Sequence, residues 1–217
     1  MKIFIDFDDV LFNTKSFVVD IKKIFEKNGV SEEIFKKYYR DSEVKKGEGI
    51  VRKYNPYKQI ERIKTQGFKT QKIEKEFRKL LKDTRKYLFE DGMEFLKEFK
   101  DEDLYVVSYG DKKFQEEKIN NSGIAKYFKK IIIVDVSKAV AIRKILKNKN
   151  IKNREALIFI DDREKFLKDI KKSYPGMATF LMKRIEGRYN DERTNYCDFE
   201  VKSFDEILNM IKTKDGE

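Results

Sequence analysis

The chain has 217 residues, of which 50 are Lys or Arg, 39 are Asp or Glu and none is His, so its formal net charge is +11. The absence of histidine excludes Ser-His-Asp catalysis, Cys-His catalysis and His-ligated zinc. The single cysteine, Cys197, excludes an internal disulfide and provides no cysteine metal cluster. Acid–base chemistry therefore depends on Asp, Glu, Lys, Tyr or Cys197.

The basic excess favours anionic partners such as phosphorylated metabolites, nucleotides or nucleic acid. Because the lysines are spread along the whole chain without an arginine-rich patch, a general compositional bias explains the charge better than a nucleic-acid surface. No apolar stretch approaches the roughly 20 residues of a membrane span, and the N-terminal segment turns acidic at Asp6, unlike a signal peptide. We expect a cytoplasmic protein without a membrane partner, either a monomer or a homodimer.

The first apolar run, at residues 3–5, predicts a buried parallel strand that leads into Asp6, Phe7 and Asp8. Alternate side chains of a strand point to the same side, so Asp6 and Asp8 are expected to face one way and Phe7 the other. Two acids at the carboxyl end of such a strand lie where open α/β sheets bind their ligands. A solvated acidic turn is the alternative interpretation of this Asp-x-Asp pattern when it is taken alone.

Residues 15–88 carry apolar side chains at three- and four-residue spacing, which predicts a series of helices. Two of these helices are expected at about residues 57–66 and 70–89. The segment 43–57 lacks the periodicity and is expected to be loose, with a flexible turn at residues 47–49. The pattern therefore predicts an all-helical insert after the first strand.

From residue 91 onward, helical patterns alternate with short apolar runs. The runs predict strands at residues 104–108, 131–135, 156–161, 177–182 and 199–201. Such alternation implies right-handed crossovers and a parallel sheet. The sequence thus predicts an α/β fold, with a three-layer, Rossmann-like parallel sheet core formed by residues 1–14 and 89–217. Residues 15–88 would form a helical cap inserted into this core.

Several of the predicted strands end in polar residues: Asp6 and Asp8, Ser108, Asp135 with Lys138 beyond it, and Asp161 with Asp162. The carboxyl ends of parallel strands share one edge of the sheet, so these residues can meet. Two carboxylates about 4 Å apart repel each other by about 4 kcal/mol at an effective dielectric constant near 20, so the cluster requires protonation or a divalent cation. Oxygen ligands suit Mg²⁺, whereas zinc would lack its usual nitrogen and sulfur ligands.

These motifs resemble those of the haloacid dehalogenase superfamily of aspartate-dependent phosphohydrolases. The segment Asp6-Phe7-Asp8-Asp9-Val10 is similar to the first motif of the family, Ser108 to the second, Lys138 to the third and Asp161-Asp162 to the fourth. The order and spacing agree over the whole chain, and residues 15–88 lie where the family often carries a helical cap. Asp9 departs from the glycine that is common at its position, and Tyr109 stands where smaller or amide residues are frequent.

The resemblance implies hydrolysis of a phosphate monoester through an aspartyl-phosphate intermediate. Asp6 would attack phosphorus, and Asp8 would protonate the leaving oxygen and then accept a proton from the hydrolytic water. Ser108 would hydrogen-bond a phosphoryl oxygen. Lys138 would offset the charge of Asp6 and the phosphoryl group, with the lysines at 112 and 113 as alternatives to it.

The resemblance also implies that Mg²⁺ is the cofactor. Asp6, the main-chain carbonyl of Asp8, and Asp161 or Asp162 would bind it. A helix N-cap is the alternative role for Asp161 and Asp162. Asp135 is expected to end a strand or cap a turn rather than bind metal.

A small phosphorylated metabolite or nucleotide is the expected substrate, because a cap over a site excludes water and macromolecules. Tyr109 and the cap residues Arg52, Lys53 and Tyr54 are candidate substrate contacts, with a solvated basic loop as the alternative for the last three. The net charge and the sequence Asp161-Asp162-Arg163 leave a nucleic-acid end phosphatase open, and a non-catalytic phosphate-binding regulatory module of the same fold is a further alternative. A phosphomutase or a dehalogenase fits less well, because the full set of acids suits phosphate and Mg²⁺.

Overall fold

A computed structural model describes residues 1–40, 43–46, 49–52, 54–147 and 155–214. Its core is a parallel sheet of six strands in the order β5-β4-β1-β6-β7-β8. The strands are β1 (Lys2–Ile5), β4 (Asp103–Tyr109), β5 (Lys130–Val134), β6 (Leu157–Asp161), β7 (Ala178–Met182) and β8 (Phe199–Val201). The predicted α/β fold with a parallel sheet is confirmed.

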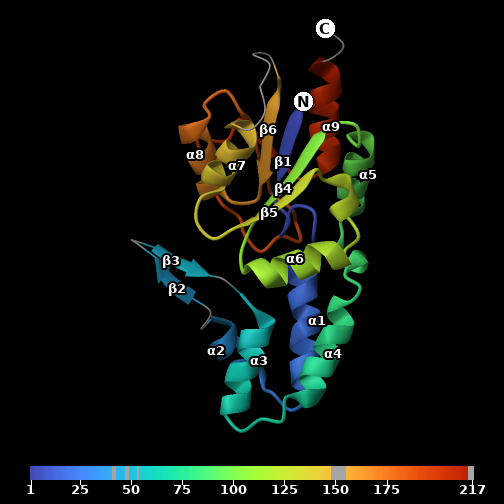
Figure 1. Ribbon diagram of the computed structural model, residues 1–217, viewed down its shortest axis with the longest axis vertical. Coiled ribbons are helices and arrows are strands. Elements are labelled where there is room, and N and C mark those ends of the chain that lie inside the picture. Colours follow the sequence, from blue (N-terminus) through green and yellow to red (C-terminus); the bar gives the residue numbers. More distant parts are fainter. Residues whose placement is uncertain (41–42, 47–48, 53, 148–154, 215–217) are drawn as a thin grey trace.

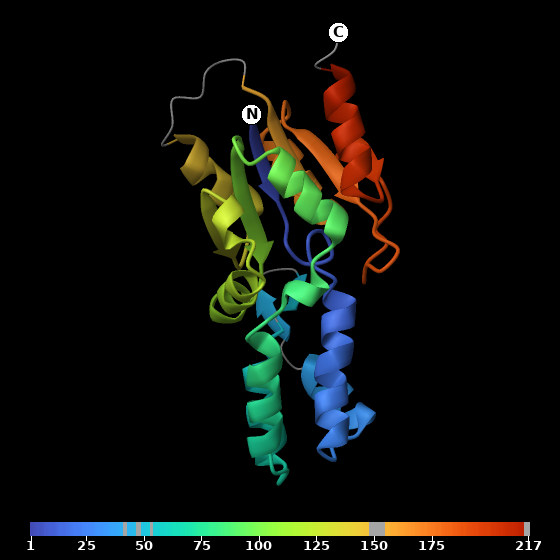
Figure 2. The ribbon, with the colours of Figure 1, turned by 90° about the vertical axis from the view of Figure 1, so that its right-hand side faces the viewer.

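Helices cover both faces of the sheet and complete three layers (Figures 1 and 2). One face carries α7 (Lys138–Lys147) and α8 (Glu164–Ser173), and the other carries α5 (Glu90–Glu98) and α9 (Phe204–Lys214). Alternate residues of β1 serve the two layers, because Ile3 and Ile5 belong to the apolar core with α5 and α9, whereas Phe4 packs with α7 and α8. Within the described residues, no helix has the length and apolar character needed to cross a membrane.

A helical insert separates β1 from β4, as predicted, and extends from one end of the core (Figure 1). Its helices are α1 (Thr14–Lys27), α2 (Glu32–Arg40), α3 (Pro56–Thr65) and α4 (Gln71–Leu81). The segment that we expected to be loose contains an antiparallel hairpin of β2 (Glu43–Lys46) and β3 (Gly49–Arg52). Strands of four residues are too short for their alternation to stand out in a charged sequence, which explains why the hairpin was not predicted.

The helix predicted at residues 70–89 was wrong in its length, because α4 ends at Leu81 and a 3-10 turn follows at Arg85–Tyr87. Contacts from α6 (Lys112–Asn121) end the helix. The side chain of Asn121 donates to the carbonyl of Leu81 at 2.7 Å, and the main-chain carbonyl of Asn121 accepts from the N–H of Thr84 at 3.2 Å. A residue distant in sequence therefore terminates a pattern that is locally helical.

The two connections between core and insert run side by side. Phe12 and Leu88 form an isolated antiparallel bridge. The N–H of Asn13 donates to the carbonyl of Tyr87 at 2.7 Å, and the N–H of Phe89 donates to the carbonyl of Leu11 at 3.0 Å. This pairing holds the insert next to the polypeptide that carries Asp6 and Asp8.

Candidate active site

Three buried acids meet at the carboxyl end of the sheet. Carboxylate oxygens of Asp6, Asp161 and Asp162 all lie within 4.8 Å of one another. Asp6 follows β1 and Asp161 ends β6, and the parallel pairing of these two strands brings the acids together. Asp135, which follows β5, is exposed and lies outside the cluster.

Lys138 lies between two of the acids and is completely buried. Its Nζ donates to Oδ1 of Asp6 at 2.7 Å and to Oδ2 of Asp161 at 2.6 Å. Lys112 and Lys113, which the sequence left as alternatives, are exposed on α6. The geometry therefore brings Lys138, and neither alternative, to the acid cluster.

The first turn of α7 positions Lys138, and α8 fixes that turn. Oδ2 of Asp169 accepts hydrogen bonds from Oγ of Ser137 at 2.8 Å and from the N–H of Ala139 at 3.1 Å. These bonds hold the residues on either side of Lys138. The main-chain position from which the Lys138 side chain extends is therefore fixed by the core.

The charges of the cluster do not balance. Burial raises the pKa of Asp6 to about 7, against the opposing effect of Lys138. Burial, together with the charges of Asp161 and Asp6, raises the pKa of Asp162 well above its usual range. Three carboxyl groups therefore lie around one ammonium group, that of Lys138. The repulsion among them favours either protonation of a carboxyl group or the binding of a further cation. Oxygen donors in a buried cluster fit a divalent cation such as Mg²⁺.

Neither acid of the Asp161-Asp162 pair caps α8 with its side chain. The N–H of Glu164 and Nε of Arg163 both donate to Oδ2 of Asp191, each at 3.0 Å, so Asp191 caps this helix. Oδ1 of Asp161 accepts from the N–H of Arg163 at 2.9 Å, which orients the carboxylate ahead of the helix. The side chain of Asp162 makes no ion pair or hydrogen bond within the described ranges and lines the cavity.

Asp8 occupies a different environment from Asp6. Its Oδ1 accepts from Oγ1 of Thr14 at 2.5 Å and from Nζ of Lys118 at 2.6 Å, and its Oδ2 accepts from Nε2 of Gln115 at 2.6 Å. Burial acts against ionisation of Asp8, but the charges of Lys118 and Arg188 and these bonds outweigh it and hold its pKa well below the usual range. Asp8 is therefore an ionised carboxylate here.

Ser108 is buried near the end of β4 and lies behind Gln115. Nε2 of Gln115 is 3.4 Å from Oγ of Ser108 and donates to the carbonyl of Tyr109 at 3.2 Å. A Cβ at Gly110 would lie 2.9 Å from Cγ of Gln115, so the absence of a side chain there permits this approach. Ser108 does not itself line the cavity, whereas Gln115 does.

Four residues around Asp8 and Asp9 were not predicted: Thr14, Gln115, Lys118 and Arg188. Lys118 had a usable signal, because it follows Phe114 by four residues and precedes Ile119 on the apolar side of α6. Its Nζ lies 5.3 Å from the ring centroid of Phe114, and Lys118 is only 2% exposed. A lysine on the buried face of a helix predicts an anionic partner. Arg188 had no such signal.

Arg188 neutralises the negative charge that Asp9 adds to the site. Asp9 is 1% exposed and has a positive φ of 57°, in the region that glycine adopts without strain. Nε of Arg188, from the loop between β7 and β8, donates to Oδ2 of Asp9 at 2.6 Å. Arg188 also hydrogen-bonds Tyr39 of the insert. The departure from glycine is therefore part of an ion pair between a buried acid and a partly exposed arginine, and this arginine also contacts the cap.

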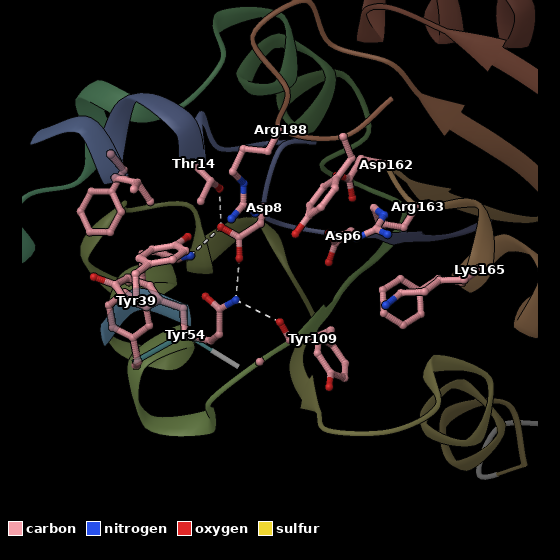
Figure 3. Close-up of a pocket in the computed structure, with 18 residues that line it drawn as sticks. Asp6, Asp8, Thr14, Tyr39, Tyr54, Tyr109, Asp162, Arg163, Lys165 and Arg188 are labelled. Atoms are coloured by element: carbon pink, nitrogen blue, oxygen red, sulfur yellow. Dashed lines mark hydrogen bonds and ion pairs between the residues drawn. The ribbon is translucent and has the colours of Figure 1, made fainter. Parts of the chain in front are cut away.

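A cavity of about 470 Å³ lies between the core and the insert and contains the site (Figure 3). Asp6, Asp8 and Asp162 line it, together with the predicted substrate contacts Tyr54 and Tyr109. The side chain of Arg52 and all of Lys53 lie outside the described residues.

The model of the haloacid dehalogenase-like hydrolase family matches residues 3–181. The chain belongs to this family. It is therefore a hydrolase of the haloacid dehalogenase type, and its insert is the helical cap of such enzymes. No protein with curated annotation matches the chain.

Solved structures share the fold over almost the full length. A haloacid dehalogenase-like hydrolase from Burkholderia xenovorans has a TM-score of 0.71 and 13% identity, covering 97% of this chain and 96% of that one. The magnesium-bound HAD-hydrolase YfnB from Bacillus subtilis has a TM-score of 0.65 and 14% identity, covering 97% of each chain. L-2-haloacid dehalogenase from Xanthobacter autotrophicus, with chloropropionic acid covalently bound, has a TM-score of 0.58 and 10% identity, covering 97% and 98%. At these identities the likeness shows the fold alone.

The Asp9–Arg188 pair generates a stability prediction. Arg188→Met leaves Asp9 buried without its cation and should lower the free energy of unfolding by about 3 kcal/mol. The double variant Asp9→Gly/Arg188→Met removes both charges and places glycine at the positive φ, so it should recover to within about 1 kcal/mol of the natural protein. Urea unfolding measures both.

Arg193→Met, at an exposed position of the same loop, is the matched control and should cost less than about 1 kcal/mol. A double variant that is no more stable than Arg188→Met would show that Arg188 acts through something other than Asp9.

Proposed function

We propose that this hydrolase cleaves phosphate monoesters of small molecules through an aspartyl-phosphate on Asp6, with Mg²⁺ as its cofactor. The observation that carries the proposal is the buried cluster of Asp6, Asp161 and Asp162 around the single ammonium of Lys138. Such an excess of buried negative charge fits a site that works on a cation and an anionic phosphoryl group together.

Asp6 is the nucleophile in this proposal. Its carboxylate lines the cavity and its Oδ1 is oriented by Lys138. Attack on phosphorus forms an acyl phosphate and releases the alcohol, which divides hydrolysis into two easier steps. Lys138 stabilises the charge that accumulates between Asp6 and the phosphoryl group.

We assign the metal ligands by asking which carboxylate oxygens of the cluster already accept hydrogen bonds. Both oxygens of Asp161 have partners, Lys138 and the N–H of Arg163, whereas Asp162 faces the cavity without one in the described chain. We therefore assign Asp6, Asp162 and the main-chain carbonyl of Asp8 as ligands of Mg²⁺, with Asp161 holding Lys138 beside them. When bound, Mg²⁺ offsets the acids and polarises the phosphoryl group.

Asp8 is assigned as the acid and base. Its ionised state suits the second half of the reaction, in which a carboxylate accepts a proton from the hydrolytic water. In the first half, the dianionic phosphoryl group of the substrate approaches Asp8 and raises the pKa of Asp8. Asp8 can then carry the proton that the leaving oxygen receives. Thr14, Lys118 and Gln115 fix the direction of this carboxylate.

The other activities fit the site less well. Displacement of a halide from carbon needs a nucleophilic carboxylate, but it gives no reason for Asp161 and Asp162 to be buried next to it. A nucleic-acid end would have to enter a cavity that the helical insert covers. A binding module without turnover would not need a carboxylate, Asp8, held by three donors beside the nucleophile.

The nucleophile is tested by Asp6→Asn. We expect Mg²⁺-dependent release of phosphate from 4-nitrophenyl phosphate to fall by about 10⁴-fold or more, because the amide cannot form the acyl phosphate. Asp135→Asn, at an exposed position just after β5, should keep the natural rate. A natural protein that hydrolyses 2-chloropropionate but no phosphate ester would contradict the proposal in favour of a dehalogenase.

The role of Asp8 is tested by Asp8→Asn. An amide can neither protonate an alkoxide nor activate water, so alkyl phosphates should lose about 10²–10⁴-fold in turnover. With 4-nitrophenyl phosphate, whose leaving group needs no proton, a burst of about one equivalent of 4-nitrophenol should precede slow turnover. Stopped-flow absorbance measures the burst. Unchanged steady-state rates with both esters would remove Asp8 from this role.

A further inference from the structure

The two sides of the cavity differ in their chemistry. The cations that line it, Arg163, Lys165 and Arg188 among them, come from the core. The insert contributes the following lining residues: Thr14, Phe17, Val18, Tyr39 and Tyr54. None of these carries a charge, and in the described part of the insert no charged side chain lines the cavity. The cap side of the cavity is thus mainly apolar and aromatic.

The phenol oxygens of the two cap tyrosines already have partners. The hydroxyl of Tyr54 donates to Oε1 of Gln59 at 2.7 Å, and Tyr39 hydrogen-bonds Arg188. Gln59 is itself fixed, because its Nε2 donates to the main-chain carbonyl of Phe35 at 2.8 Å. Both phenol oxygens are thus engaged with protein groups, and the rings are the main surface that these tyrosines add to the cavity.

The rings form a continuous aromatic wall, which we define as Tyr39, Tyr54 and Phe114. The ring centroids of Tyr39 and Tyr54 are 4.2 Å apart, and those of Tyr54 and Phe114 are 6.1 Å apart in a T-shaped pair with an interplanar angle of 87°. Tyr54 precedes α3, Tyr39 belongs to α2 and Phe114 to α6, so three separate elements fix the wall. Figure 3 shows Tyr39 and Tyr54 on the opposite side of Asp8 from Asp6.

This placement assigns the wall to the leaving group. If Asp6 receives the phosphoryl group and Asp8 protonates the departing oxygen, the organic part of the substrate extends past Asp8 toward the insert. The described cap residues that line the cavity offer no charged side chain to a bare sugar or a second phosphate. A flat aromatic group would find ring surface, with which it can stack.

We propose that the substrate is a phosphate monoester whose leaving group carries a flat aromatic ring, such as the base of a nucleoside monophosphate, packed against the aromatic wall. This inference rests on the phosphatase function proposed above. A cavity of about 470 Å³ has the size of sites that enclose ligands of this class.

Two matched pairs of substrates test the ring without changing the ester. Adenosine 5′-monophosphate and ribose 5-phosphate share a primary 5′ ester and differ in the base. Benzyl phosphate and cyclohexylmethyl phosphate share a primary ester and differ in the flatness of the ring. We expect kcat/KM to be at least about 10-fold higher for the aromatic member of a pair, since stacking on one base has this magnitude. A preference in the first pair alone identifies a nucleoside, and one in both pairs identifies a general aromatic ester.

Variants of the wall locate the preference. Tyr54→Ala should reduce the adenosine to ribose ratio by about 10-fold, whereas Tyr54→Phe, which keeps the ring and loses the bond to Gln59, should retain it. Phe68→Ala removes a cap aromatic that does not line the cavity and should leave the ratio unchanged. If Tyr54→Ala does not fold, Tyr54→Leu replaces it, because leucine keeps apolar volume without an aromatic face.

The failures of the two proposals are distinct. Hydrolysis of ribose 5-phosphate and cyclohexylmethyl phosphate as efficient as that of their aromatic partners would overturn the aromatic-substrate inference and leave the phosphatase function intact. A ratio unaffected by Tyr54→Ala would overturn the role of the wall. No hydrolysis of these four esters or of 4-nitrophenyl phosphate would overturn the phosphatase function, and the inference with it.

Discussion

The site depends on one imbalance of charge, in which a single buried ammonium group, Lys138, is shared by Asp6 and Asp161 while Asp162 stands beside them without an ion pair in the described chain. Unneutralised carboxylates at such distances are costly in a buried environment, so they remain together where a rigid frame forces them to and a cation can join them. The frame is the pairing of β1 with β6 and the anchored start of α7. This constraint explains why the acids gathered at this edge of the core fit a metal ion.

The other acids of the site, Asp8 and Asp9, differ from this cluster because each forms an ion pair with a cation of its own. Asp8 has Lys118 and Asp9 has Arg188, at 2.6 Å in each case. The balanced pairs hold Asp8 ionised, and Arg188 also hydrogen-bonds Tyr39 of the insert, whereas the unbalanced cluster next to them favours a metal. Two adjacent groups of acids therefore acquire different chemistry because their neighbours differ.

The sequence predicted the features that repeat or that end a buried strand. The parallel strands and the meeting of Asp6 with Asp161 followed from apolar runs ending in acids, because sheet geometry brings those ends together. The α4 boundary at Leu81 could not be predicted, since Asn121 of α6 sets it. The role of Arg188 could not be predicted either. It lies in a loop, and its partner Asp9 is 179 residues away in the sequence. Lys118 could have been found from its place on the apolar side of a helix.

The central claim is that Asp162 belongs to a cluster held together by a divalent cation, and its most direct test is thermal unfolding with and without Mg²⁺. For the natural protein, saturating Mg²⁺ should raise the unfolding midpoint, with a gain of about 2.7 kcal/mol at a concentration 100 times the Kd. Asp162→Asn should unfold at a higher temperature than the natural protein without metal, because an amide avoids the cost of burying a carboxyl group either ionised or protonated against its ordinary pKa, and should lose most of the response to Mg²⁺. An unresponsive natural protein, or a metal-free Asp162→Asn that is less stable than it, would contradict the account.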